Sequence, residues 1–466
     1  MTCELLRQHF TRLQQAFAKN PMPSAAERSD WLEQLRQALI KQQDAIAAAI
    51  SQDFGHRSAD ETRMVELLPS VLGIAHARRN LKRWMRPQRR WPSLLFQPSC
   101  AKVYYQPVGV VGIVVPWNSP VFLSIGPLTS ALAAGNRVML KMSEHAPATA
   151  KLMQQLVQSI FPQDLVSVVL GDAQLGKAFT QLPFDHLLFT GSTAVGKKVM
   201  RAAAENLTPV TLELGGKSPT IVDESANLAD AAERIAFAKL LNAGQFCVAP
   251  DYILLPKQCL NEFIVQLRLV LQRFQPTLAD NPDCTWIINQ QHQQRLRALV
   301  EDAQIKGAKL TSLHAEQAHE RNMPLLVLTE VTDCMRVMQE EVFGPVLPIM
   351  VYEDFYDAVA YVQQRPRPLA LYFFSHNKER QQHILAQTHA GGTCINEALL
   401  HVAQPDLPFG GIGSSGIGSY HGREGFLTFS HAKAVLTKSR INPMRLIYPP
   451  YGGRFQRIIE WLFLRR

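Results

Sequence analysis

Cysteine is scarce in this chain. Seven cysteines occur in 466 residues, with no CxxC pair and no cysteine–histidine spacing typical of zinc. A metal site is therefore not predicted. An odd number of scattered cysteines in a chain of this size fits a reducing compartment better than a disulfide framework. We expect a cytoplasmic protein.

Long apolar runs are also missing. No stretch reaches the roughly 18 apolar residues that span a bilayer, and the first residues lack the apolar core of a secretory signal. The segment 454–466 is too short to span, but arginines flank its bulky apolar residues. Such a tail can lie at a membrane interface. A tail helix docked on its own protein or on a partner subunit is the favoured alternative.

Acidic residues are outnumbered by basic ones, which gives a formal net charge of +9. Basic residues gather between Arg78 and Arg90, interleaved with Trp84 and followed by Trp91. Charge of this kind attracts nucleic acid or anionic membranes non-specifically, but alone it indicates neither partner. A solvated helix face explains the cluster better, so no nucleic-acid partner is predicted.

Short runs of Val, Ile and Leu alternate with helical segments from residue 110 onward, after a first helix predicted over 25–50. Continuous apolar runs, rather than strict alternation, are typical of parallel strands buried on both faces. The pattern predicts an α/β protein with a doubly wound, Rossmann-like domain and a second α/β domain. The main predicted strands are 110–115, 137–142, 166–170, 187–189, 252–255 and 392–395.

A glycine-rich segment follows near the end, at 408–419. So many glycines indicate a loop with close backbone approaches. The loop is either a flexible linker or, because it is apolar and irregular, the wall of a pocket.

Three residues stand where they can do chemistry. Cys247 lies in a predicted turn between a helix and a strand, although a lone cysteine is more often a small buried apolar residue. Glu213 ends a β-rich run before two glycines, where the plainer interpretation is a surface ion pair with Lys217. Asn118 follows the first strand of the series, where ligand crevices open, although it could simply form an Asx turn before Pro120. The three together indicate a covalent enzyme.

The chain resembles aldehyde dehydrogenases in six motifs that occur in the family's order: Pro116-Trp117-Asn118, Phe189-Thr190-Gly191-Ser192, Glu213-Leu-Gly-Gly-Lys217, Gly244-Gln245-x-Cys247, Glu341-Val-Phe-Gly-Pro345 and Pro408-Phe-Gly-Gly411. The segments 249–252, 420–422 and 448–450 look like the class 3 branch. Within that branch, 399–408 and 424–430 look like the bacterial coniferyl aldehyde dehydrogenases.

The resemblance implies a domain plan. It assigns residues 1–90 and 107–212 to an NAD(P)-binding domain and 213–398 to a catalytic domain. Residues 91–106 and 420–440 would form a small β oligomerisation arm, and 441–466 a C-terminal tail. Because 100–106 and 433–436 resemble family dimerisation elements, a homodimer is expected.

The resemblance also implies roles for the three catalytic candidates. The Cys247 thiolate would attack an aldehyde carbon and form a thiohemiacetal, then a thioester. The Asn118 amide and the Cys247 backbone N–H would hold the oxyanion. Glu213 would activate the water that releases a carboxylic acid.

Further residues are assigned to the cofactor by the same resemblance. Lys141 and Glu144 look like the pair that meets the adenosine ribose, and a carboxylate there disfavours a 2′-phosphate, so NAD is favoured although NADP can also be accepted. The helix that opens at Gly191 and Ser192 can meet the pyrophosphate. The other residues assigned to cofactor binding are Trp117, Gly196, Glu341 and Phe343.

Two positions depart from the family pattern. Ser119 stands where class 3 enzymes often have Tyr, and Phe246 stands where Thr commonly precedes the nucleophile. A reshaped acyl pocket is our hypothesis, with apolar or aromatic aldehydes, including coniferaldehyde-like ones, as substrates. The alternatives are a dehydrogenase that passes the acyl group to coenzyme A and a catalytically idle binding protein of the same fold. The presence of Glu213 argues against transfer to coenzyme A. The presence of Cys247, Glu213 and Asn118 together argues against an idle binding protein.

Overall fold

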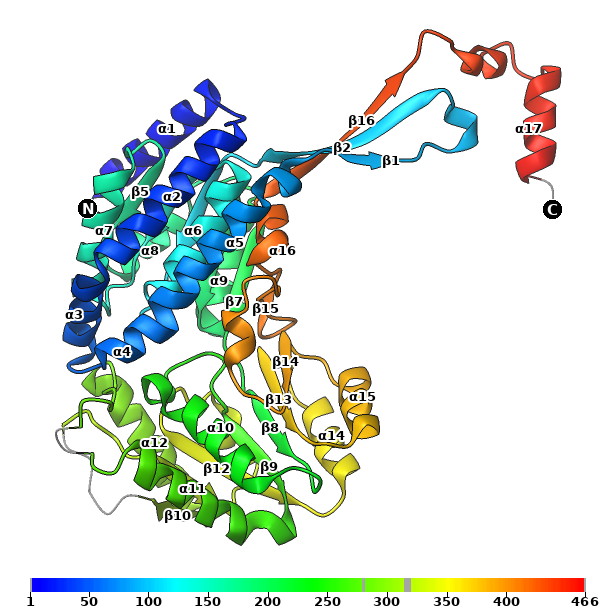
Figure 1. Cartoon of the computed structure of the whole chain (residues 1–466). Coiled ribbons are helices and arrows are strands. Elements are labelled where there is room, and N and C mark those ends of the chain that lie inside the picture. Colours follow the sequence, from blue (N-terminus) through cyan, green and yellow to red (C-terminus); the bar gives the residue numbers. More distant parts are fainter. Residues whose placement is uncertain (1, 279–280, 314–319, 465–466) are drawn as a thin grey trace.

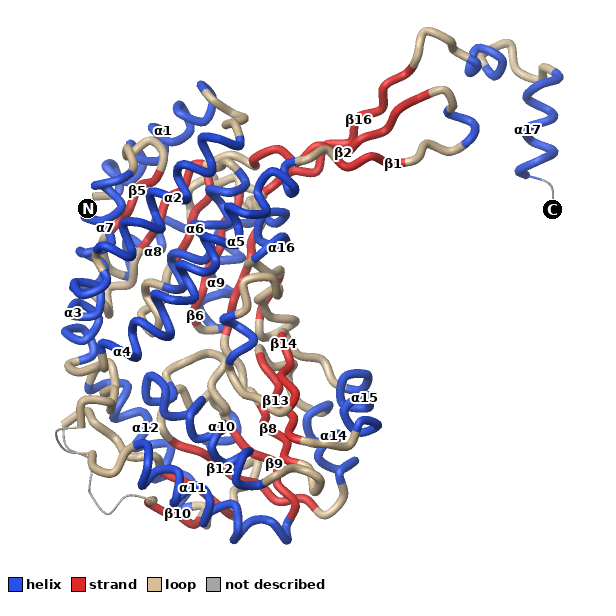
Figure 2. Tube along the Cα trace, viewed as in Figure 1, coloured by secondary structure: helices blue, strands red, loops and turns tan. Residues whose placement is uncertain are grey.

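Two sheets, each covered by helices, form the body of the molecule, and a thin arm extends from it (Figure 1). The computed structural model describes residues 2–278, 281–313 and 320–464. The chain completes most of the first sheet before it enters the second, as the sequence colouring shows (Figure 1). The strands of the two sheets form separate groups, with helices around each (Figure 2).

The first sheet has the strand order β15-β7-β6-β3-β4-β5. Its strands pair in parallel, except that β15 runs antiparallel to β7. All five residues of β4 are buried, as expected for a central strand of a parallel sheet. The strands are β3 (Val110–Val114), β4 (Arg137–Lys141), β5 (Val166–Val169), β6 (His186–Gly191), β7 (Val210–Leu214) and β15 (Gly416–Ile417).

Helices cover both faces of this sheet. One face packs against α1 (Cys3–Lys19), α8 (Ala173–Thr180) and α9 (Thr193–Ala204). The other face packs against α6 (Phe122–Ala134) and α7 (Pro147–Ile160), which are covered in turn by α2 (Ala25–Lys41), α3 (Gln43–Phe54) and α5 (Leu68–Met85). The sheet is therefore doubly wound, as the sequence predicted. The helix expected over 25–50 is two helices, because Gln42 leaves the helical conformation with φ −99° and ψ 11°.

The second sheet has the order β10-β11-β12-β9-β8-β13-β14. Only its edge strand β10 is antiparallel to its neighbour. The strands are β8 (Pro219–Val222), β9 (Tyr252–Pro256), β10 (Lys309–Ser312), β11 (Leu326–Thr329), β12 (Val346–Tyr352), β13 (Ala370–Phe374) and β14 (Gly392–Ile395). Its helices are α10 (Leu228–Leu240), α11 (Leu260–Phe274), α12 (Gln290–Ile305), α13 (Arg336–Gln339), α14 (Phe355–Gln363) and α15 (Lys378–Gln387).

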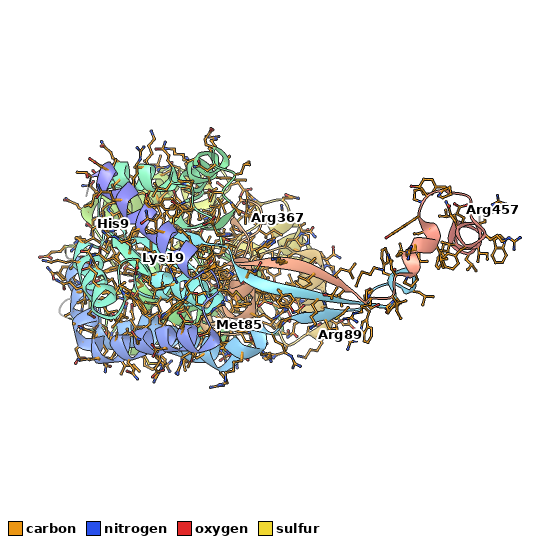
Figure 3. All side chains as sticks on the ribbon, turned by 90° about the horizontal axis from the view of Figure 1, so that it is seen from above. His9, Lys19, Met85, Arg89, Arg367 and Arg457 are labelled. Atoms are coloured by element: carbon orange, nitrogen blue, oxygen red, sulfur yellow. The ribbon has the colours of Figure 1, made fainter. Side chains whose placement is uncertain are left out.

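The arm is a three-stranded antiparallel sheet of β1 (Gln88–Arg90), β2 (Ser99–Pro107) and β16 (Ser430–Lys438). Beyond its tip lies the tail helix α17 (Arg454–Leu464), well away from the body, as the position of Arg457 shows (Figure 3). The expected docking of the tail on its own protein is therefore not observed. Within the described ranges, no helix is long and apolar enough to cross a membrane.

The elements fall at slightly different places from the implied domain boundaries. The arm sheet begins at Gln88 rather than at residue 91. At the other end, α16 (Gly422–Thr428) packs against α5 and α6, so the arm begins at Ser430 rather than at residue 420. Glu213 lies on β7 and so belongs to the first sheet. The observed boundaries differ from the implied ones because strand pairing and helix packing join residues far apart in the sequence, and these contacts decide to which domain an element belongs.

The glycine-rich loop is part of the packed structure. Gly416 pairs with Glu213 and Ile417 with Leu212, so the loop continues the first sheet. A Cβ on Gly411 would lie 1.9 Å from the Ser415 carbonyl oxygen, a distance that no side chain tolerates. The linker interpretation of this segment was therefore wrong.

Candidate active site

A cavity of about 230 Å³ lies where the first sheet meets the second domain. It brings together all three catalytic candidates and five of the residues assigned to the cofactor. Its lining is Pro116, Trp117, Asn118, Thr190, Gly191, Ser192, Glu213, Gly215, Cys247, His292, Arg295, Glu341 and Phe343. Lys141, Glu144 and Gly196 lie outside this lining.

A left-handed turn presents Cys247 to the cavity. After α10 the chain passes through Asn242, Ala243 and Gly244, with φ of 51°, 51° and 71°. A Cβ on Gly244 would lie 2.6 Å from the Gly344 carbonyl oxygen, so glycine is required at that point. The turn stops the helix abruptly and leaves Cys247 at the cavity wall.

Glu213 is buried next to this thiol. Its side chain is on β7, the residue is 1% exposed, and neither carboxylate oxygen hydrogen-bonds to any described residue. Burial raises the pKa of Glu213 to about 7, although the Cys247 thiol and the Thr190 hydroxyl act to lower it. The expected surface ion pair with Lys217 was wrong, because Lys217 instead binds Asp251 and two backbone carbonyls.

The thiol itself is held in its neutral form. Burial, and then the charge of Glu213, raise the pKa of Cys247 well above its ordinary value. A free-standing thiolate is therefore not the resting state. A carboxylate whose pKa is near neutrality, lying beside a thiol, is instead suited to accept the thiol proton as the sulfur attacks.

Asn118 lies in the loop between β3 and α6. The residue is buried, and its backbone carbonyl accepts a hydrogen bond from the Asn242 side chain at 2.9 Å. Its own side-chain amide hydrogen-bonds to none of the described residues, so it remains able to donate to an oxyanion at the cavity. The turn before Cys247 thus holds the loop that carries Asn118.

Glu341 and Phe343 close the opposite side of the cavity. A Cβ on Gly215 would lie 2.1 Å from the Glu341 carboxylate, so the glycine makes room for that side chain. Burial, with the charges of Asp251 and Glu213, raises the pKa of Glu341 to about 8. One of its buried oxygens has no hydrogen-bond partner among the described residues. That oxygen is therefore free to accept a hydrogen bond from a ligand hydroxyl. The Phe343 ring lies 5.4 Å from the Trp117 ring.

The remaining cofactor candidates lie at the carboxyl end of β4 and around the start of α9. Lys141, the last residue of β4, donates to Glu144 at 2.7 Å. Burial would raise the pKa of Glu144, but hydrogen bonding, chiefly from Lys141, lowers it. Ser192 caps α9, whereas Gly196 faces Leu214, where its missing side chain lets α9 approach β7.

Sequence reasoning missed His292 and Arg295, both on α12. The His292 ring lies 4.9 Å from the Trp117 ring, and burial, with the charges of Arg295 and His145, lowers its pKa to about 4. Arg295 donates to the Glu341 carbonyl at 3.0 Å. Neither residue lies in a recognisable motif, so the sequence carried no signal for them.

The fold and the cavity define a class of protein: a two-domain α/β enzyme with a cysteine–carboxyl pair where the domains meet. Comparison with known proteins identifies the family. Residues 5–435 match the aldehyde dehydrogenase family. The chain therefore belongs to the aldehyde dehydrogenases and oxidises aldehydes.

Its relatives include bacterial and class 3 enzymes. It is 59% identical over 456 residues to a probable coniferyl aldehyde dehydrogenase of Pseudomonas aeruginosa, covering 98% of this chain and 96% of that protein. It is 38% identical to aldehyde dehydrogenase family 3 member B1 of Rattus norvegicus, covering 96% and 95%. These relatives confirm the resemblance to the class 3 branch and the coniferyl aldehyde dehydrogenases.

Solved structures agree on the fold. The substrate-bound state of Staphylococcus aureus AldH has a TM-score of 0.93 and 37% identity, covering 98% of this chain and 99% of that one. A Mycobacterium tuberculosis aldehyde dehydrogenase complexed with NAD+ has a TM-score of 0.84 and 29% identity, covering 93% and 90%. The family uses NAD(P), and the partnerless Glu341 oxygen at the cavity suits a ribose hydroxyl.

Proposed function

We propose that this enzyme oxidises apolar or aromatic aldehydes to carboxylic acids through a covalent adduct on Cys247, with NAD preferred over NADP. The observation that carries the proposal is that the partly buried Cys247 and the buried Glu213 line one cavity with Asn118. NAD is preferred because the Glu144 carboxylate would repel a 2′-phosphate. The reaction belongs in the cytoplasm, where the Cys247 thiol stays reduced.

The first step makes the adduct. The Cys247 sulfur adds to the aldehyde carbon, the thiol proton passes to Glu213, and the carbonyl electron pair moves to oxygen. The Asn118 amide and the Cys247 N–H hold that oxygen. Trp117 and Glu341 would hold NAD(P)+, which when bound would accept the hydride of the same carbon.

The second step releases the acid from the thioester on Cys247. Glu213, having lost its proton to solvent, takes a proton from water while the water oxygen attacks the carbonyl carbon. The carbon–sulfur bond then breaks, and the departing sulfur takes that proton back from Glu213, which restores both the thiol and the carboxylate. One carboxyl with a pKa near neutrality can serve both steps, because it exchanges its proton readily at neutral pH.

The relatives indicate the class of substrate. The chain is 59% identical to a probable coniferyl aldehyde dehydrogenase and 44% identical to a coniferyl aldehyde dehydrogenase. We therefore propose that its substrates carry an apolar or aromatic group such as that of coniferaldehyde. A separate cavity lined by Trp84, Phe122, Val402 and His421 has a volume of only about 30 Å³, which is too small for such a group.

An aldehyde panel tests the function. Purified protein is given NAD or NADP with coniferaldehyde, benzaldehyde or hexanal, and the reduced cofactor is followed by its absorbance. We expect turnover with NAD to exceed turnover with NADP, and the aromatic aldehydes to be oxidised best. The absence of reduced cofactor with every aldehyde would contradict the proposal.

Replacing Phe246 by threonine should change which aldehydes are accepted. Phe246 is partly buried against the main core beside the nucleophile, so the smaller side chain enlarges the adjacent space. We expect the ratio of kcat/KM for coniferaldehyde to that for hexanal to change by about tenfold, the usual effect of reshaping an apolar pocket. If both enzymes show the same ratio, Phe246 does not shape the pocket. Ser119→Tyr serves as the companion variant.

We also propose that the arm binds a second copy of the chain. Strand β16 is an edge strand of nine residues, and nearly all of them are exposed. A long exposed edge presents unpaired backbone groups that readily pair with another chain. Leu436 adds an exposed apolar side chain to this edge. A homodimer would cover these groups.

For the tail helix α17 we propose contact with an anionic membrane surface. Phe455, Ile458, Ile459 and Leu462 stand at positions i, i+3, i+4 and i+7 of the helix and so form one apolar stripe. Ile458 and Leu462 are 54% and 60% exposed. Arg454 and Arg457 lie off this stripe. An apolar face with flanking arginines is typical of helices that lie in the plane of a membrane interface.

Acidic substitutions on the stripe should abolish vesicle binding. We expect the wild type to co-sediment with phosphatidylglycerol vesicles, and Ile458→Glu/Leu462→Glu to bind at least about tenfold more weakly, because burying apolar side chains drives such binding. Gln456→Glu adds negative charge off the stripe and is the control. Light scattering should give a dimer for all three proteins. A monomeric stripe variant would instead show that the tail binds the second copy.

A further inference from the structure

Arg57 lies completely buried between two carboxylates in the helical segment that precedes the first sheet. Its Nε donates to Glu61 at 2.9 Å and its Nη1 to Glu66 at 2.6 Å, and Arg57 is 1% exposed. We call Glu61, Arg57 and Glu66 the triad. It lies outside the cavity that holds Cys247.

A break in helical geometry brings both carboxylates to one guanidinium. Between α4 (Ala59–Thr62) and α5 the chain forms one π-helical turn, Arg63–Leu67. In an α-helix, side chains five residues apart point about 140° away from each other. A π-turn takes up one extra residue, so Glu66 comes to the face of Glu61. Such turns occur frequently at functional sites.

One end of the triad holds the turn that carries the nucleophile. The Glu61 carboxylate accepts from the backbone N–H of Asn242 at 3.0 Å. The Asn242 side chain in turn donates to the carbonyls of Asn118 at 2.9 Å and Gln245 at 3.3 Å. Glu61 therefore contacts the nucleophile turn directly and is connected to Asn118 through one residue, Asn242.

The other end holds the loop that carries Asn118. Glu66 accepts from the backbone N–H groups of Val121 at 2.8 Å and Phe122 at 3.2 Å. These groups lie at the start of α6, where the helix dipole favours a negative charge. The triad thus touches both segments that border the reacting atoms, and it does so from a third segment.

We propose that Arg57 is a positioning residue that, through Glu61 and Glu66, fixes the separation between the Asn118 amide and the Cys247 sulfur. Buried ion pairs contribute little net stability, so geometry is the better explanation for three buried charges here. A misplacement of about 1 Å can slow an enzyme about a hundredfold. The inference rests on the catalytic roles proposed for Asn118 and Cys247.

The test compares Arg57→Met and Arg57→Lys with a matched control. Arg28 is equally buried and donates to the carbonyls of Ala133 and Ala134, at the other end of α6. We expect both Arg57 variants to lower kcat by about 10- to 100-fold with the KM for NAD within about threefold. Arg28→Met should lower Tm and leave kcat within about threefold. Arg57→Lys keeps the positive charge, so it remains informative if Arg57→Met does not fold. A lysine ammonium cannot hold both carboxylates in the fixed geometry of a guanidinium, so the positioning is lost in this variant too.

A double-mutant cycle with Asn118→Ala shows whether Arg57 acts through Asn118. If it does, adding Arg57→Lys to Asn118→Ala should lower kcat by less than about threefold further, because the donor that Arg57 positions is already gone. An unchanged kcat in both Arg57 variants, or losses that multiply in the double variant, would overturn the inference. Undiminished activity of Asn118→Ala alone would instead refute the proposed role of Asn118.

Discussion

Cys247→Ala should lower the rate of aldehyde oxidation by at least about 10⁴-fold, the scale seen when a covalent nucleophile is removed. Without the sulfur no thiohemiacetal or thioester can form, and Cys247 carries the only thiol in the described lining of the cavity. The fold should survive, because alanine fills most of the same space in the turn. Reduced-cofactor absorbance measures the loss, and NAD binding by calorimetry shows that the site persists.

A second buried cysteine provides the control for this variant. Cys394 lies 3.2 Å from the His401 imidazole, and burial raises its pKa to about 11. Cys394→Ala also removes a thiol with a raised pKa, but one that lies outside the cavity. We expect its rate of aldehyde oxidation to stay within about threefold of the wild type, because replacing one cysteine by alanine is a small change in the core. Equal losses in the two variants would mean that Cys247 matters only for folding. Full activity of Cys247→Ala would refute the covalent mechanism.

Glu213→Gln is expected to lower kcat by about 10²- to 10⁴-fold, the contribution typical of a general base. Glutamine fills the same buried position but cannot take a proton from water, so the thioester should accumulate on Cys247. Rapid mixing should then show about one equivalent of reduced cofactor per site, followed by slow turnover, and mass spectrometry should find the acyl adduct. A slow enzyme without that burst would place the larger loss before hydride transfer, in the step where Glu213 accepts the thiol proton, and would contradict slow acid release as the cause.

The pH profile tests the same assignment independently. The basic form of Glu213 is the active one in acid release, and burial raises its pKa to about 7. The kcat of the wild type should therefore fall as pH drops below 7 and level off above it. Glu213→Gln has no group to titrate there, so its residual kcat should stay flat between pH 6 and pH 8, about one unit either side of that pKa. A retained slope would assign the titration to another group.

Much of the fold was readable from the sequence, because parallel strands buried on both faces need continuous apolar runs. Val110–Val114 and Arg137–Lys141 are such runs, and both form central strands. The motif residues could be predicted for a related reason, because each lies at the end of a strand or helix or just beyond it, where backbone geometry restricts the choice of residue. Cys247, Glu213 and Asn118 indeed meet in one cavity.

The contacts that position the site residues could not be predicted from the sequence. Glu61 reaches Asn242 across 181 positions of sequence, and the π-turn that aligns Glu61 with Glu66 has no residue signature. His292 approaches Trp117 only because the second domain packs on the first. Such contacts follow from tertiary packing, which local patterns do not encode. For the same reason the sequence misplaced the start of the arm sheet.

Strand β15 has a consequence for biosynthesis. Gly416 pairs with Glu213, and the Leu214 N–H donates to the Ser415 carbonyl at 2.9 Å, so the outer edge of strand β7, which carries the proposed base Glu213, is completed by about the last tenth of the chain. During translation Cys247 leaves the ribosome long before that edge is closed. A nascent or prematurely terminated chain would therefore hold an unfinished site, and the reactive thiol would gain its base only when synthesis is almost complete.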